Sequence, residues 1–144
     1  MQLPRYKVLL MDDEVYLIQA LKVALEIFGN FEVFTAPNGA QGLELCATHH
    51  PHVIVLDVRM PQLNGYQVVR ALRGDPATAQ LPLILLSAMA QPRDRLIGLM
   101  SDVDIYLEKP VSPQHLIDAI HQALGFSQQE REERLRRLAE SPQS

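Results

Sequence analysis

The 144-residue chain is 47% hydrophobic and 21% charged, which is typical of a folded globular domain and too apolar for a disordered one. Its formal net charge of −4 argues against a nucleic-acid-binding surface, which would need clustered lysine and arginine. With one cysteine, no apolar leader and no apolar run of roughly 20 residues, we expect a cytoplasmic protein without disulfides or membrane spans.

Five short apolar segments are the predicted strands, and the first, third and fourth are continuous runs of apolar residues. Such runs indicate strands buried on both faces, as in the centre of a parallel sheet. The second alternates, with Phe31, Val33 and Thr35 set against Glu32 and Phe34, and so resembles an edge strand. The predicted strands cover residues 8–11, 31–36, 53–56, 83–86 and 105–107.

Five segments with helical spacing of apolar residues alternate with these strands. The first helix is predicted over residues 14–28 and the second over 38–49; Ser112 before Pro113 is a favourable start for the fifth, which ends before Gly125. The expected apolar stripes are Val15, Ile18, Leu21, Leu25 and Phe28; Ala40, Leu43 and Ala47; Tyr66, Val69 and Leu72; Leu96, Leu99 and Met100; and Leu116, Ile120 and Leu124.

The alternation predicts an α/β fold, a (βα)5 doubly wound parallel sheet of five strands with the flavodoxin-like order 2-1-3-4-5. Residues 1–126 form the predicted domain. Residues 127–144 are predicted to form an extra, charged C-terminal helix with a frayed end, because opposite charges recur there at the i, i+4 spacing. That helix is either simply solvated, or a partner or dimer helix, or the start of a linker to an output domain.

Polar side chains gather where the predicted strands end. Asp12 and Asp13 follow the first strand and Asp57 follows the third, next to the point where the strand order reverses and ligands usually bind. Clustered carboxylates repel one another, and Mg²⁺ is the cation that such oxygen ligands favour. Ser87 and Lys109, after the fourth and fifth strands, add the hydroxyl and the ammonium that suit phosphoryl transfer. Taken alone, Asp12 or Asp13 could be an ordinary helix cap.

At this point the sequence resembles the receiver domain family of response regulators, of the single-domain, chemotaxis-regulator-like kind. The resemblance runs from about Arg5 to Gly125. The matching stretches are VLLMDDE at 8–14, VLDVRMP at 55–61 with NG at 64–65, LSA at 86–88 and DIYLEKP at 104–110. The resemblance implies that Asp57 accepts a phosphoryl group and that Asp12, Asp13 and Asp57 bind Mg²⁺ with the backbone carbonyl of Arg59.

The resemblance also implies roles at the ends of the fourth and fifth strands. Ser87 and Lys109 would hold the phosphoryl oxygens, with a cis bond between Lys109 and Pro110. Tyr106 matches a switch aromatic that turns when Ser87 moves, so the change would be read on the face of helix 4, strand 5 and helix 5. The other interpretation of Tyr106 is a tyrosine at the edge of the core with its hydroxyl in water.

We therefore expect a phosphorylation-switched receiver of a two-component signalling system. Its partners would be a sensor histidine kinase or phosphotransfer protein and a downstream protein, with a homodimer possible and without direct contact with nucleic acid or membrane. It would be no enzyme beyond Mg²⁺-dependent self-phosphorylation and slow autodephosphorylation. Arg59 and Met89 are expected to flank the approach of water to Asp57 and to modulate that dephosphorylation.

Other functions fit the sequence less well. Cys46, His49 and His50 with His52 could form a metal patch, but histidines at a helix C-terminus also suit the helix dipole. A module of the same fold that no longer accepts phosphate would not need all five polar groups. A flavodoxin-like FMN carrier would need a Ser/Thr-rich phosphate loop after the first strand, and a haloacid-dehalogenase-type phosphatase would need an acid where Arg59 stands.

Overall fold

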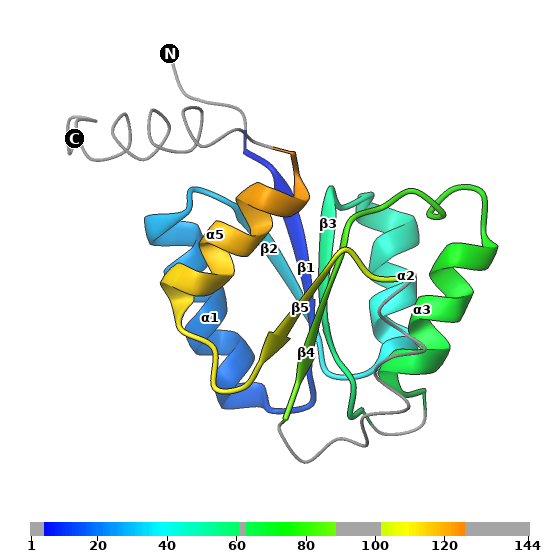
Figure 1. Ribbon diagram of the computed structural model, residues 1–144, viewed down its shortest axis with the longest axis horizontal. Helices are drawn as coiled ribbons and strands as arrows, with labels where there is room; N and C mark the ends of the chain where they lie inside the picture. Colours follow the sequence, from blue (N-terminus) through cyan, green and yellow to red (C-terminus); the bar gives the residue numbers. More distant parts are fainter. Residues whose placement is uncertain (1–4, 61–62, 89–101, 126–144) are drawn as a thin grey trace.

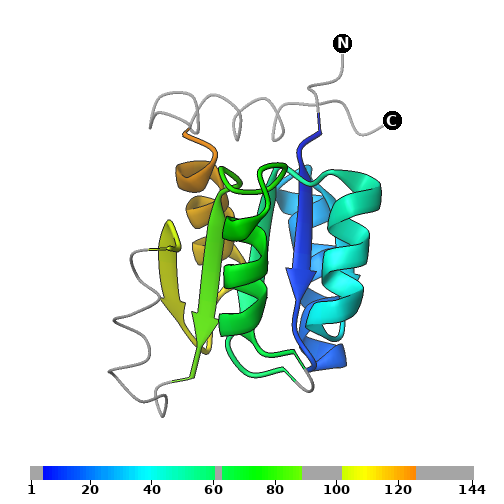
Figure 2. The ribbon, with the colours of Figure 1, turned by 90° about the vertical axis from the view of Figure 1, so that its right-hand side faces the viewer.

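The computed structural model describes residues 5–60, 63–88 and 102–125. It contains one sheet of five parallel strands: β1 (Lys7–Met11), β2 (Glu32–Ala36), β3 (Val53–Asp57), β4 (Leu83–Ser87) and β5 (Ile105–Glu108). Their order is β2-β1-β3-β4-β5, which confirms the predicted order and places β2 at an edge (Figure 1). Because every strand runs the same way, all five carboxyl ends meet at one rim of the sheet (Figure 2).

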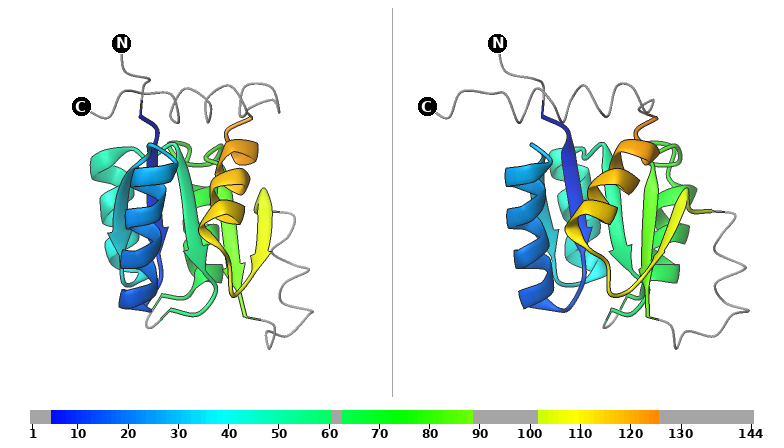
Figure 3. Two further views of the ribbon diagram at one scale, coloured as in Figure 1. Left: turned by 90° about the vertical axis from the view of Figure 1, so that its left-hand side faces the viewer. Right: turned by 60° about the vertical axis from the view of Figure 1, so that its left-hand side comes forward.

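Four helices are described: α1 (Val15–Phe28), α2 (Gly39–His49), α3 (Gly65–Gly74) and α5 (Pro113–Ala123). Helices α1 and α5 cover one face of the sheet and α2 and α3 the other, so the fold is doubly wound (Figures 1 and 3). The predicted fourth helix, Met89 and the segment 127–144 lie outside the described residues. None of the helices in the described ranges is long and apolar enough to cross a bilayer.

Side-chain caps begin three of these helices. Ser112 accepts a hydrogen bond from the His115 backbone N–H, as its position before Pro113 predicted. Asn64 and Gln67 form a reciprocal capping box at the start of α3. Each cap satisfies a backbone N–H that has no partner within its helix, and so fixes the residue at which the chain leaves its loop.

The core consists of two apolar layers, one on each face of the sheet. All five residues of β3 and all five of β4 are buried, as continuous apolar runs predict for central strands. Leu25 of α1 and Leu116 of α5 belong to one layer, and Val68 of α3 belongs to the other. This packing fixes the strand ends, and hence the rim, on a rigid base.

Two predicted helix faces were wrong in part. On α1, Ile18, Leu21 and Leu25 are buried, but Val15 and Phe28, the first and last residues of the helix, are 54% and 63% exposed.

On α2, Ala40 and Ala47 are exposed, and the buried residues are Gly39, Gly42 and Cys46. Gly42 lies directly against the Met11 side chain, where any Cβ would clash. The helix thus approaches the sheet through its glycines, which apolar periodicity does not register.

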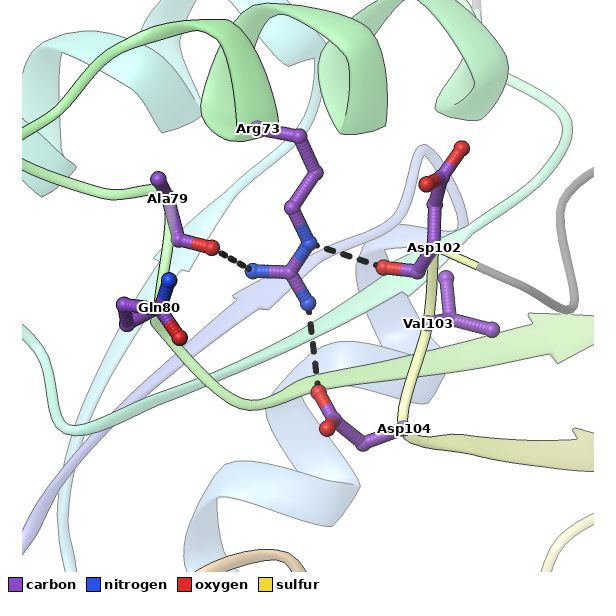
Figure 4. Close-up of a pocket in the computed structure, with 6 residues that line it drawn as sticks. All are labelled: Arg73, Ala79, Gln80, Asp102, Val103 and Asp104. Carbon is purple, nitrogen blue, oxygen red and sulfur yellow. Dashed lines mark hydrogen bonds and ion pairs between the residues drawn. The ribbon is translucent and has the colours of Figure 1, made fainter.

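Arg73 near the end of α3 fastens the opposite end of the sheet (Figure 4). Its guanidinium donates to the carbonyl oxygens of Asp102 (2.8 Å), Ala79 (3.0 Å) and Leu81 (2.6 Å), and pairs with the Asp104 carboxylate at 3.2 Å. The segments that lead into β4 and β5 are therefore tied to one side chain. All three guanidinium nitrogens make such contacts. Arg73, Ala79, Asp102 and Asp104 also line a small surface pocket, and the contacts of Arg73 account for this arrangement as a structural link between the loops.

Candidate functional site

Three carboxylates meet at the carboxyl rim. Asp57 is the last residue of β3, while Asp12 and Asp13 follow the end of β1, the neighbouring strand. Asp12 and Asp57 are buried and Asp13 is exposed. One oxygen from each side chain can be chosen so that all three lie within 4.8 Å of one another. The convergence expected from the strand order is therefore present.

Lys109, directly after β5, reaches across the rim into this cluster. Its Nζ lies 2.8 Å from Asp12 Oδ2, 3.2 Å from Asp57 Oδ2 and 2.9 Å from Glu14 Oε1. The Lys109–Pro110 bond is cis, as the resemblance implied. Three carboxylates thus share one ammonium, and Glu14 is the partner for which no role was predicted. The feature of the sequence that could have indicated this contact is the position of Glu14 directly after Asp12 and Asp13.

Burial sets the protonation behaviour of these groups. Burial, reinforced by the nearby Asp12 charge, raises the pKa of Asp57 to about 6 although Lys109 pulls it down. Burial also raises the pKa of Asp12, against the opposing effect of Lys109. For Lys109, burial disfavours the charge, but the surrounding carboxylates outweigh it and hold the pKa above its ordinary value. One ammonium does not neutralise the carboxylates at the rim, so a bound cation would be stabilised there.

Ser87 lies on the other side of Asp57, at the end of β4. The Val58 N–H donates to the Leu86 carbonyl at 3.0 Å, and the Lys109 N–H donates to the Ser87 carbonyl at 2.8 Å. The backbone therefore holds the three strand ends in line. The Ser87 hydroxyl is fully buried and donates to the Ala88 carbonyl at 3.1 Å.

Gly65 supports the rim from behind Asp57. A Cβ at this position would lie 2.6 Å from the Asp57 carbonyl oxygen and 2.8 Å from Val58 Cα, both of which are backbone atoms. The Gly65 N–H donates to the Val58 carbonyl at 2.9 Å. The start of α3 thus presses against the backbone that carries Asp57, and only glycine allows it to approach so closely.

The other residues predicted for the site are Arg59, Met89 and Tyr106. Arg59 is exposed two residues after Asp57, and Met89 lies outside the described residues, so only one of the two flanking positions can be located. Tyr106 is half-buried and packs against the apolar layer beneath α2 and α3. This position suits the edge-of-core interpretation, and the switch role stays a prediction.

The possible metal patch at the end of α2 finds no support in its geometry. His50 is the helix C-cap with a positive φ of 52°, His49 stacks on Phe34 at a ring distance of 4.2 Å, and Cys46 is buried. His52 Nδ1 accepts the Lys7 backbone N–H at 2.9 Å. Within the described ranges, the acidic cluster at the rim is the one group of side chains that could hold a metal ion.

That cluster fits the Mg²⁺ that the resemblance implied. Its donors are carboxylate oxygens alone, two of the three carboxylates are buried, and burial already disfavours their negative charge. Hard oxygen ligands next to open positions suit Mg²⁺ better than zinc or copper. The residues that would hold the ion are Asp12, Asp13 and Asp57.

The chain is similar in sequence to response regulators. The family model for the response regulator receiver domain matches residues 8–121. A probable transcriptional regulator ycf27 of Cyanophora paradoxa is 38% identical over 116 residues, which are 81% of this chain and 47% of that protein. Response regulator Rre1 of Synechocystis is 32% identical over 120 residues, which are 83% and 52% of the two chains. The chain thus spans about half the length of the curated relatives it matches.

Solved receiver structures have the same fold. The Francisella response regulator 1452 receiver domain is 33% identical with a TM-score of 0.74, over 84% of this chain and 98% of that one. The chemotaxis response regulator CheY4 of Vibrio cholerae is 27% identical with a TM-score of 0.75, over 83% and 99%.

Proposed function

The chain belongs to the response regulator receiver domain family, and from that membership we propose that Asp57 is the residue that accepts the phosphoryl group. The observation that carries this proposal is the position of Asp57 at the end of the central strand. On its β1 side lie Asp12 and Asp13, and on its β4 side lies Ser87. Of the three clustered carboxylates, only Asp57 comes from the strand between the other acids and the hydroxyl.

The proposed reaction transfers a phosphoryl group from a phosphohistidine of a sensor kinase or phosphotransfer protein. A bond forms between a carboxylate oxygen of Asp57 and phosphorus, while the bond from phosphorus to the histidine nitrogen breaks and the imidazole leaves. The charge of the transferred group lies on three equatorial oxygens, and catalysis is mostly the neutralisation of that charge. Lys109, with Nζ 3.2 Å from Asp57 Oδ2, and Ser87 are proposed to hold those oxygens.

Bound Mg²⁺ would supply further positive charge against the phosphoryl oxygens. Asp12, Asp13 and Asp57 are the proposed side-chain ligands, and the backbone carbonyl of Arg59 is proposed as a fourth. The chain's own part is to hold these groups at one rim and to keep water from the buried carboxylates.

A protein phosphodonor must reach this rim, and helix α1 begins there. All five large apolar side chains that are exposed within the described residues belong to α1: Val15, Tyr16, Val23, Ile27 and Phe28. A single helix with so many exposed apolar residues is typical of an interaction surface. Tyr16, Val23 and Ile27 lie on the face of α1 opposite its buried residues, and we propose this outer face as part of the surface on which the phosphodonor docks.

We propose that a downstream protein reads the switch on the face of the predicted fourth helix, β5 and α5, with Tyr106 as the switch aromatic. Relatives of about twice the length carry names that include transcriptional regulation. A receiver that acts on a further domain or on a separate protein fits those names equally.

The proposal is tested by labelling. The protein is incubated with a small-molecule phosphodonor and Mg²⁺, and the adduct is mapped by mass spectrometry. We expect one phosphoryl group on Asp57, and its loss in Asp57→Asn. Asp118→Asn on α5, which removes a carboxylate hydrogen-bonded only to Gln114 among the described residues, is the control that should label normally. Undiminished labelling of Asp57→Asn would rule the proposal out.

A further inference from the structure

Glu14 has a contact that the proposed reaction does not explain. Its Oε1 accepts a hydrogen bond from Lys109 Nζ at 2.9 Å, although Glu14 belongs neither to the three clustered carboxylates nor to the strands. We propose that Glu14 is a positioning residue: it holds the Lys109 ammonium beside the rim when a divalent cation takes over Asp12 and Asp57. The inference rests on the proposed function and assigns a further residue to the same site.

The three partners of Lys109 differ in one respect that matters. The side chains of Asp12 and Asp57 are 2% and 6% exposed, and both are proposed metal ligands. The Glu14 side chain is 60% exposed and stands outside the cluster. Among the described residues, Glu14 is therefore the one carboxylate that can keep Lys109 without competing for the cation.

The local backbone prepares Glu14 for this task. Glu14 is the N-cap of α1, a position whose side chain usually accepts a hydrogen bond from the first turn, but its side chain makes no such bond. Instead, Asp12 Oδ1 accepts the Glu14 backbone N–H at 2.9 Å. The backbone of Glu14 is thus tied to Asp12, and its carboxylate is left to reach Lys109.

A bound cation would compete with the ammonium for the same carboxylate oxygens. Lys109 Nζ lies 2.8 Å from Asp12 Oδ2, and a cation on that oxygen would repel the ammonium at so short a distance. Without Glu14, the ammonium either stays and opposes the cation or moves into water, away from Asp57. With Glu14, it shifts toward a partner that it already contacts. A half-exposed ion pair is weak, so Lys109 remains free to move to a phosphoryl oxygen later.

The substitution Glu14→Gln should therefore weaken Mg²⁺ binding. It removes a negative charge close to the cluster, and it returns Lys109 to Asp12 and Asp57 as a competitor. We expect the dissociation constant for Mg²⁺, measured by isothermal titration calorimetry, to rise about three- to tenfold. Glu108→Gln is the matched control: it removes the same charge one residue before Lys109, from a carboxylate without an ion pair in the described part of the chain. Its effect should stay below about twofold.

A double-mutant cycle isolates the contact. In a Lys109→Met background there is no ammonium to hold, so only the loss of the Glu14 charge remains, and Glu14→Gln should raise the dissociation constant by a smaller factor than it does in the wild type. Equal effects of Glu14→Gln in the two backgrounds would overturn the proposal. If Lys109→Met does not fold, the comparison of Glu14→Gln with Glu108→Gln in the wild type decides alone, and equal effects there would overturn it too.

The same titrations separate this inference from the proposed function. If Asp13→Asn binds Mg²⁺ as the wild type does, the metal site itself is misplaced. If Asp13→Asn loses Mg²⁺ but Glu14→Gln binds it normally, the metal site stands and only the role of Glu14 is wrong.

Discussion

Asp57 is a carboxylate in surroundings that resist its charge. Burial and the Asp12 charge raise its pKa to about 6, above the value near 4 expected in an unfolded chain. A raised pKa means that the folded protein binds the proton more tightly than the unfolded one. The stabilisation is therefore complete below pH 4 and is lost as the pH rises through 6.

This sign predicts how Asp57→Asn changes stability. In metal-free buffer with a chelator, the variant should gain stability relative to the wild type as the pH rises from 4 to 7, by on the order of 2–3 kcal/mol. Urea unfolding at several pH values measures the difference, with Asp118→Asn as a control that should show little pH dependence. A difference between wild type and Asp57→Asn that is flat across this range would contradict the burial-driven pKa.

Much of the rim could be predicted at the level of residues. Asp12, Asp13 and Asp57 follow strands that are recognisable in the sequence, and parallel strands end at one edge, so their meeting follows from topology. The contact between Glu14 and Lys109 could not be predicted, because it depends on the reach of two side chains across 95 positions of sequence. Periodicity carries no information on such a distance.

At the scale of elements, the approach of α3 to β3 has a measurable cost. An added methyl at Gly65 would meet the backbone of Asp57 and Val58 at less than 3 Å, and neither can move without disturbing the rim. We expect Gly65→Ala to destabilise the fold by roughly 1–3 kcal/mol and to reduce the labelling of Asp57.

The same helix supplies the control for that substitution. Gly74, at the other end of α3, has no heavy atom within 4 Å of where its Cβ would be, apart from its chain neighbours and the backbone of its own helix. Gly74→Ala should be neutral or stabilising by up to about 1 kcal/mol, with normal labelling. Denaturant midpoints and mass-spectrometric labelling of the two variants are the measurements, and equal behaviour would mean that the Gly65 contact is not restrictive.

The elements themselves were predictable, and their buried faces only partly so. Continuous apolar runs identified β3 and β4, and Ser112 before Pro113 identified the start of α5. The face of α2 was missed because two of its three buried residues are glycines, which have no side chain to contribute to an apolar stripe. The close packing of α2 on the sheet depends on residues without side chains, so a pattern of apolar side chains cannot predict it.

At the scale of the whole molecule, the chain should function without its last residues. The match to the receiver family ends at residue 121, and the described core ends at Gly125. The segment that follows is neutral by count, with four acidic and four basic residues: Glu130, Glu132, Glu133, Glu140, Arg131, Arg134, Arg136 and Arg137. Its removal leaves the net charge unchanged.

A chain truncated after Ser127 should therefore still label on Asp57 with Mg²⁺, at a rate within about twofold of the full chain. Sedimentation of the two forms would show whether the segment sets the association state. Loss of labelling on truncation would mean that the segment forms part of the folded site, contrary to the predicted division at residue 126.

The docking surface that we propose on the outer face of α1 bears on how one signalling pair is kept apart from others in the same cell. Val23 and Ile27 and the ring of Tyr16 offer contact area without directional chemistry, so many apolar helices could pack against them. Discrimination between donors would then depend on the neighbouring polar side chains of Gln19, Lys22 and Glu26. A mismatched charge weakens binding of a wrong partner more than an apolar contact strengthens binding of the right one. On this proposal, the specificity for one phosphodonor would depend on three polar residues of a helix whose other exposed side chains bind apolar surfaces without selecting among them.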